Sequence, residues 1–319
     1  MAMYHLNMKL VGRASGRSAV AAAAYRAADC LENRRDGQVH DFTQRSGVEH
    51  AEIVLPVGAD AQWAKERSAL WNAAEAAEKR KDARVAREVE VSLPHELTFE
   101  QRLALTRDFA QELAERYSVA VDFALHAPHS ATDGRNRHAH LMMTTRMVGT
   151  EGLGRKSDIE LDNRKLLARG LPTSHEQLRA IRAGWEMLAN AHLKRAGLEL
   201  RIDHRSHAER GLQIEPTQHV GVHATQMERR GKEVSRVRLD PEAAKRNAEL
   251  IRARPEQVLT IVASEKRVFD RDDVARTLRR YIDGADEFEA TLPEALLAWR
   301  SCPVRAVCVP LSCHVSGRR

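Results

Sequence analysis

The stretch that decides the fold of this chain is Arg137-His138-Ala139-His140-Leu141-Met142-Met143. Two histidines separated by one residue on a β-strand point to the same face of the sheet. The stretch before it, residues 119–126, also alternates and ends at His126. Between them, residues 127–136 contain the turn pair Asp133-Gly134, which favours pairing of the two stretches as a hairpin. That pairing would bring three imidazoles together on one polar face.

Three imidazoles on one face are typical of a divalent transition-metal site that keeps one coordination position open for a substrate. The alternative is a chance pair of histidines, because the chain contains 15 of them. The third histidine, with the matching strand parity, favours the metal site. We therefore predict His126, His138 and His140 as ligands of one ion, which could be Mn²⁺, Mg²⁺ or Zn²⁺.

Two further stretches alternate between apolar and polar residues, residues 3–10 and residues 88–93. Together with the two histidine strands they predict an antiparallel sheet with one packed face and one open polar face. The polar face would carry the three histidines, and helices would pack on the other face. The fold class predicted from these patterns is therefore α+β.

Three helices are predicted from their caps and apolar stripes. They are residues 60–80 with Asp60 as N-cap, a helix opened by a capping box at Thr98, and a helix that begins at Thr173 or Ser174. A fourth helix is rich in alanine and runs through residues 19–28, after serines that can cap its start.

Tyr25 is the one large polar side chain in the alanine-rich helix. A tyrosine at such a position usually packs its ring, but it can also act as a nucleophile. Arg13 and Arg17 near the helix start would favour a phosphate there, by their charge and through the free N–H groups of the first turn. These residues alone leave both interpretations of Tyr25 open.

Several blocks of the chain resemble, in order, the MobA/MobL family of plasmid relaxases. They are residues 3–6 with 15–26, residues 87–94, the three-histidine block with His126 and residues 138–142, and residues 203–206 with 216–221. Residues 255–260 and 280–283 resemble the Ti-plasmid type of conjugative relaxase. Members of that type continue into a helicase region, which a chain of 319 residues is too short to contain.

The resemblance implies a relaxase-like fold and a metal-dependent enzyme that nicks one DNA strand at a plasmid transfer origin during conjugative mobilisation. Tyr25 would attack the scissile phosphate and form a 5′-phosphotyrosine intermediate. Glu88 is the expected catalytic carboxylate, which could orient a histidine ligand or accept the tyrosine proton. Glu90, Asp122 and His5 are candidates for supporting the metal ligands.

The partners implied by the resemblance are single-stranded or supercoiled plasmid DNA, relaxosome accessory proteins and a coupling protein. Two other functions remain compatible with the sequence. One is a rolling-circle replication initiator, which uses related chemistry, and the other is a DNA-binding remnant that no longer cleaves. The intact tyrosine and histidines argue against the remnant, and the position of the alanine-rich helix before the histidines favours mobilisation.

Charge agrees with a polyanionic partner, since 51 Lys and Arg against 45 Asp and Glu give a net charge of +6. Aromatic residues make up 4% of the chain, so an extended base-stacking platform is not expected. The arginines predicted to contact DNA are Arg13, Arg17, Arg34, Arg35, Arg229 and Arg230.

We expect residues 1–225 to form the relaxase domain and residues 226–300 to form a basic linker with a small helical appendage. Residues 301–319 have no helical period and are expected to be disordered, as a departure from the family pattern through truncation or a frameshift. The cysteine spacing fits neither a zinc ribbon nor a disulfide framework. No apolar run reaches transmembrane length and no secretory signal is recognisable, so a cytoplasmic location is expected.

Overall fold

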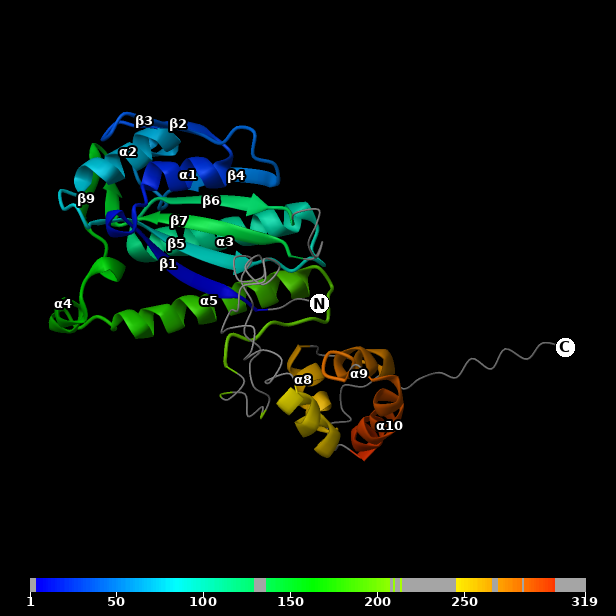
Figure 1. Cartoon of the computed structure of the whole chain (residues 1–319). Helices are drawn as coiled ribbons and strands as arrows, with labels where there is room; N and C mark the ends of the chain where they lie inside the picture. Colours follow the sequence, from blue (N-terminus) through cyan, green and yellow to red (C-terminus); the bar gives the residue numbers. More distant parts are fainter. Residues whose placement is uncertain are drawn as a thin grey trace. The chain divides into compact units, whose positions relative to one another are not determined.

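The computed structural model describes residues 4–128, 136–206, 209, 213, 245–265, 269–282 and 284–301 (Figure 1). The chain divides into two compact units, Met1–Leu198 and Glu199–Arg319. The expected domain boundary near residue 225 stays a prediction, because residues 214–244 lie outside the described residues. The same holds for Arg229, Arg230 and the tail from residue 302 onward.

The first unit is built on a five-stranded sheet in which every neighbouring pair is antiparallel. The strand order is β1 (Leu6–Gly12), β5 (Arg84–Ser92), β7 (His138–Thr144), β6 (Val121–His126) and β4 (Val48–Val54). The four alternating stretches of the sequence therefore form strands, as predicted. The edge strand β4 was not predicted, because its seven residues mix charged and apolar side chains without strict alternation.

One face of the sheet is covered by α3 (Phe99–Tyr117), and α5 (Ser174–Arg195) packs on α3. The rings of Phe109 and Trp185, both fully buried, lie 5.0 Å apart between these helices. Helix α3 begins with the capping box predicted at Thr98, and α5, expected to begin at Thr173 or Ser174, has Thr173 as its N-cap in a second capping box. This is the packed apolar face of the sheet.

The opposite face carries the histidines, but it is not open along its whole length. Helices α1 (Ala19–Ala27) and α2 (Arg67–Ala77) cover one end of it, and their buried side chains form one hydrophobic cluster with Met142. The helix predicted at residues 60–80 is shorter than expected. Its N-cap is Glu66 rather than Asp60, because residues 62–65 form a 3-10 turn first.

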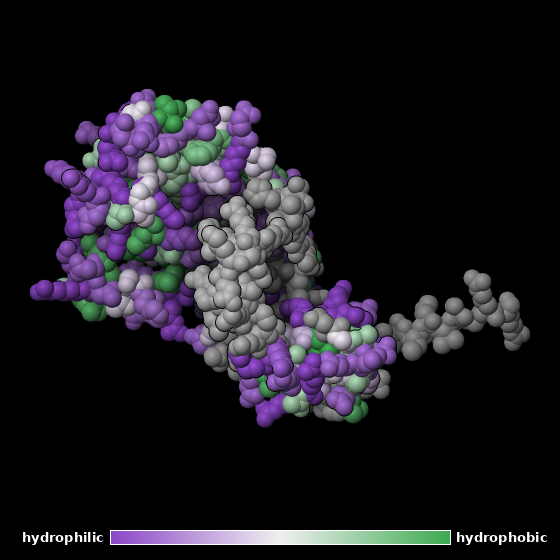
Figure 2. All heavy atoms as spheres, in the orientation of Figure 1, coloured by the Kyte–Doolittle hydropathy of each residue, from purple (hydrophilic) through white to green (hydrophobic). Residues whose placement is uncertain are grey.

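Shorter elements fill the connections of the first unit. They are the hairpins β2 (Cys30–Asn33) with β3 (Gln38–Asp41) and β8 (Arg146–Gly149) with β9 (Gly152–Lys156), the short helix α4 (Asn163–Ala168) and the 3-10 turns Arg13–Ser15, Gln62–Lys65 and Asp158–Glu160. Figure 2 shows that hydrophilic side chains dominate the visible face of this unit. No helix among the described residues is long and apolar enough to span a membrane.

The second unit contains a helix at residues 245–253, α8 (Gln257–Glu265), α9 (Arg271–Leu278) and α10 (Ala285–Ser301). Its core is mostly aliphatic and includes the fully buried side chains of Ile251, Val258 and Val274. Asp270 caps α9 in a capping box with Asp273.

Candidate metal centre and nucleophile

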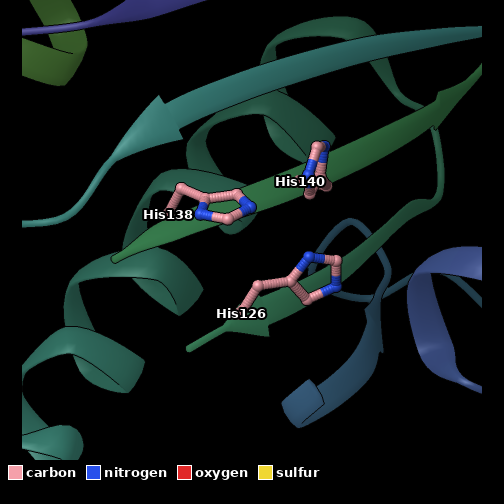
Figure 3. Close-up of side chains that lie close together, drawn as sticks. All are labelled: His126, His138 and His140. Carbon is pink, nitrogen blue, oxygen red and sulfur yellow. The ribbon is translucent and has the colours of Figure 1, made fainter. Parts of the chain in front are cut away.

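Three histidines meet at the end of the sheet that α1 and α2 leave uncovered. His126 on β6 lies directly opposite His138 on β7, and His140 follows two residues later on the same face. The ring centroids are 4.9 to 5.2 Å apart, and one ligand nitrogen from each ring lies within 4.8 Å of the others (Figure 3). The convergence expected from strand parity is therefore present.

The hydrogen bonds of the three rings fix which nitrogen of each is free. Nδ1 of His140 donates to Oε1 of Glu88 at 2.6 Å, and Nδ1 of His138 donates to the Asn136 carbonyl at 3.3 Å. Nε2 of His126 donates to the Arg26 carbonyl at 2.8 Å. A carbonyl or carboxylate can only accept, so each of these nitrogens carries the proton. The free nitrogens are Nδ1 of His126 and Nε2 of the other two histidines.

Nδ1 of His126 is buried and has no hydrogen-bond partner among the described residues. An unpaired buried acceptor is costly, and a metal ion would supply the partner that the protein does not. Burial lowers the pKa of His126 to about 3, and burial together with neighbouring His140 lowers the pKa of His138. Both rings are therefore neutral near pH 7, which is the form that binds metal. The site fits a divalent ion.

Glu88 connects this centre to the helix that bears the tyrosine. Its carboxylate accepts from His140 and from Nε and Nη2 of Arg26, each at 2.6 Å, and it is 2% exposed. Burial opposes ionisation, but the hydrogen bonds from His140 and Arg26 outweigh it and lower the pKa of Glu88 to about 2. The carboxylate is therefore ionised, and it orients the His140 ring.

Tyr25 lies in the last turn of α1, next to Arg26. Ser18 is the N-cap of this helix, as one of the predicted serines, and the helix ends at Ala28, whose φ is 52°. The Tyr25 side chain is 45% exposed, so its ring is accessible to a large substrate. Because Arg26 bonds His126 through its carbonyl and Glu88 through its side chain, the backbone of the tyrosine is tied to two of the three histidines.

Arg26 and Arg45 are the residues of this centre that sequence reasoning missed. Arg26 gave a weak signal, because it follows Tyr25 in the alanine-rich block. Arg45 gave none, since it lies in a polar loop between β3 and β4. Its guanidinium carbon is 4.1 Å from the centre of the Tyr25 ring.

The three candidates for supporting the metal ligands, Asp122, Glu90 and His5, have different surroundings in the structure. The oxygens of Asp122 accept from Arg67 and from Nε1 of Trp71 rather than from a histidine, and these bonds anchor α2 to the sheet. Glu90 accepts from Lys9 at 2.6 Å. His5 is exposed, just before β1.

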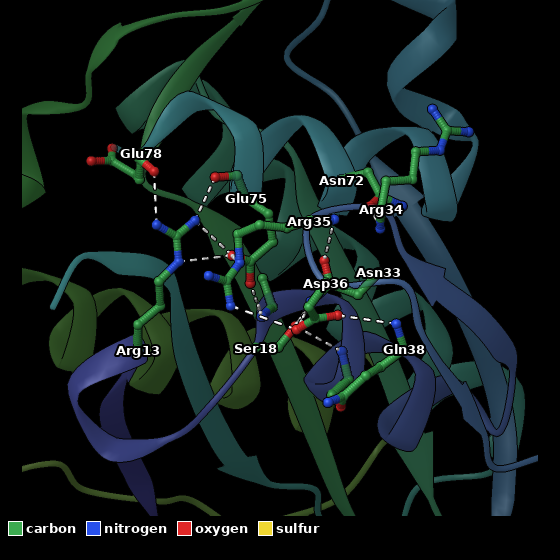
Figure 4. Close-up of polar contacts among 12 residues, drawn as sticks. Arg13, Ser18, Asn33, Arg34, Arg35, Asp36, Gln38, Asn72, Glu75 and Glu78 are labelled. Atoms are coloured by element: carbon green, nitrogen blue, oxygen red, sulfur yellow. Dashed lines mark hydrogen bonds and ion pairs between the residues drawn. The ribbon is translucent and has the colours of Figure 1, made fainter. Parts of the chain in front are cut away.

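Arg13 is buried within the protein rather than presented to DNA. Its guanidinium donates to the Glu75 carboxylate and to the carbonyls of Glu75, Glu78 and Arg80, so all three nitrogens are engaged (Figure 4). The side chain is 7% exposed. Glu75 also accepts from the Ala19 N–H at 2.8 Å, so a carboxylate stands where a phosphate was expected.

The other N-terminal arginines predicted to contact DNA remain accessible. Arg17 and Arg34 are exposed, and the Arg34 side chain projects away from the Glu75 network (Figure 4). Arg35 is 47% exposed and lies 3.5 Å from Glu75. Their contact with DNA stays a prediction.

The sequence model of the MobA/MobL family matches residues 17–230. Mobilization protein MobL of Acidithiobacillus ferridurans is 43% identical in an alignment of 261 positions that covers 75% of this chain and 67% of that protein. The probable conjugal transfer protein TraA of Sinorhizobium fredii is 36% identical over 93% of this chain, which spans 29% of the length of TraA.

A solved structure described as the molecular basis of vancomycin resistance transfer in Staphylococcus aureus is similar as well. It is 29% identical, has a TM-score of 0.54, and is covered completely by 64% of this chain. The family match, which spans more than half of the chain, agrees with the resemblance of the sequence blocks. The chain belongs to the MobA/MobL family.

Proposed function

We propose that this chain is a relaxase that nicks one strand of plasmid DNA at a transfer origin and keeps the 5′ end as a phosphotyrosine on Tyr25. The observation that carries the proposal is the connection between the tyrosine and the histidine centre. Arg26 bonds the His126 ring through its carbonyl and reaches His140 through Glu88. A nucleophile and a metal site joined in this way can act on one phosphate.

The histidine centre would hold one divalent ion through Nδ1 of His126 and Nε2 of His138 and His140. When bound, the ion polarises the scissile phosphate and neutralises charge on its oxygens. Each histidine would bind the ion through the ring nitrogen that has no hydrogen bond to the protein. Three imidazoles favour the softer ions, while phosphate oxygens also accept Mg²⁺ or Mn²⁺.

The reaction of Tyr25 is an exchange of one phosphate ester for another. The phenol oxygen forms a bond to the phosphorus, and the bond to the 3′ oxygen breaks. The phenol proton is lost, and the departing 3′ oxygen gains a proton. The phosphotyrosine keeps the ester, so the reverse exchange can rejoin the strand without ATP. This distinguishes a strand transferase from a hydrolytic nuclease.

Glu88 acts in this proposal by orienting His140 rather than as the base for Tyr25. Three donor atoms occupy its two oxygens, and its low pKa makes it a weak proton acceptor.

The predicted partners follow from the family: the transfer origin of a plasmid, accessory proteins bound there, and a coupling protein. Arg17 and Arg34 would contact the DNA backbone.

A nicking assay tests the proposal. A supercoiled plasmid that carries the DNA flanking this gene should become nicked circles when the chain is added with Mn²⁺ or Mg²⁺, and chelation should stop the reaction. The triple variant His126→Ala, His138→Ala, His140→Ala should be inactive. His175→Ala is the matched control, because His175 is exposed on α5. Cleavage that survives thorough chelation or the triple substitution would contradict the proposal.

A further inference from the structure

The loop between β3 and β4 holds the Tyr25 side chain from two sides. Phe42 meets the tyrosine ring edge-on, with centroids 5.2 Å apart and an interplanar angle of 90°. The Arg45 guanidinium lies over the ring, with its central carbon 4.1 Å from the centroid. A cation at this distance is attracted to the electron-rich face of the ring. The ring is therefore oriented although nearly half of the side chain is exposed.

Arg45 is also attached to the backbone of the tyrosine. Its Nη1 donates to the Tyr25 carbonyl at 2.9 Å. The last carbonyls of a helix have no partner within the helix, and here Tyr25 and Arg26 offer two in succession. Arg45 bonds the first and His126 bonds the second. The guanidinium is thereby fixed between the tyrosine and the histidine centre.

Arg45 lies beside His126 without a hydrogen bond to it. Nη1 is 3.5 Å from Nε2 of His126, which already carries the proton that bonds the Arg26 carbonyl. Two proton-bearing nitrogens cannot hydrogen-bond each other, so the positive charge of Arg45 lies next to a metal ligand without a hydrogen bond to it. An anion bound at the centre would account for a positive charge at this position.

The Arg45 guanidinium has further N–H groups that can donate hydrogen bonds to such an anion. It carries five N–H groups in a planar fork, and in the described part of the chain its one hydrogen bond is from Nη1. Arginine binds phosphate oxygens through two parallel hydrogen bonds, which a lysine cannot do. The Arg45 side chain is partly exposed, so a phosphate can reach it.

We propose that Arg45 holds the Tyr25 ring in place and binds the non-bridging oxygens of the scissile phosphate with its remaining N–H groups. This rests on the proposed nicking function. Arg45 would then hold the Tyr25 phenol and the scissile phosphate close together. Its N–H groups would stabilise the charge that builds up on the phosphate during the exchange. A role as a helix cap alone would need neither free donors nor the position over the ring.

Three variants separate these roles. Arg45→Met keeps the aliphatic stem over the ring and removes the charge and donors. Arg45→Lys restores the charge but not the fork. Arg116→Ala is the matched control, because Arg116 is an exposed arginine paired with Glu112 on α3. The measurement is the single-turnover rate of covalent adduct formation with saturating oligonucleotide.

The Arg45→Met variant should form the adduct on the order of 100-fold more slowly than wild type, with only a small fall in melting temperature from the lost bond to the Tyr25 carbonyl. Arg45→Lys should form the adduct faster than Arg45→Met but more slowly than wild type. Arg116→Ala should form it at the wild-type rate. An Arg45→Met rate within twofold of wild type would overturn the proposal while leaving the nicking function intact.

A second measurement decides the proposal even if the wild-type chain does not nick DNA. The Nε–H resonance of Arg45, identified by its loss in Arg45→Met, is followed by NMR while a dinucleotide phosphodiester is added under chelation. The resonance should shift with the charged phosphodiester and stay unchanged with the uncharged methylphosphonate analogue. No shift, or equal shifts with both compounds, would overturn the phosphate-binding role.

Discussion

Replacing Arg13 tests whether this arginine supports the fold or contacts DNA. Its guanidinium and the Glu75 carboxylate are 7% and 1% exposed, so Arg13→Ala would leave a buried carboxylate without its main partner. Breaking a buried ion pair from one side costs about 3–5 kcal/mol of unfolding free energy. Glu75 also accepts from the first N–H of α1, so the loss should extend to the helix that carries Tyr25.

Urea denaturation measures the loss, and two comparisons identify its cause. In Arg13→Met combined with Glu75→Met no charge is left buried, so much of the stability should return. Exposed Arg34→Ala should change stability by no more than about 0.5 kcal/mol. A phosphate contact contributes about 0.9 to the slope of log affinity against log salt, so this slope should fall in Arg34→Ala but not in the double variant. A loss under about 1 kcal/mol in Arg13→Ala would refute this account.

Three further predictions follow from the same geometry. His126→Ala should abolish binding of one equivalent of divalent metal, measured by calorimetry, while single-strand binding persists because backbone charge supplies that affinity. Asp122→Ala should lower the unfolding free energy by about 3 kcal/mol, because partly buried Arg67 and the buried N–H of Trp71 lose the carboxylate that they share, yet leave metal affinity unchanged. A metal affinity about 10-fold weaker than that of wild type would show instead that Asp122 supports the ligands. Thr98→Ala should cost roughly 1 kcal/mol in thermal unfolding through loss of the α3 cap.

The elements that carry the site were predictable because they depend on local periodicity. The parity of His126 with His138 and His140 follows from strand alternation, and the register of β6 with β7 realises it. The cap at Thr98 follows from residues three apart, and the start of α5 at Thr173 is one of the two positions that the sequence offered. Neither feature needs knowledge of distant contacts.

The features that could not be predicted are contacts between residues far apart in sequence. Arg26 and Glu88 are 62 residues apart, as are Arg13 and Glu75. No spacing rule distinguishes an arginine that pairs with a buried carboxylate from one that faces solvent. For this reason Arg13 was predicted to contact DNA, and Arg45 was not singled out.

The central claim is that Tyr25 forms a covalent bond with DNA. The chain is incubated with Mn²⁺ and a single strand spanning the candidate cleavage sequence, and the trapped complex is digested and analysed by mass spectrometry. Wild type should carry the 5′ phosphate on Tyr25, and Tyr25→Phe should bind the strand equally well but form no adduct. An adduct on Tyr4, Tyr117 or Tyr281, or cleavage by Tyr25→Phe, would contradict the account.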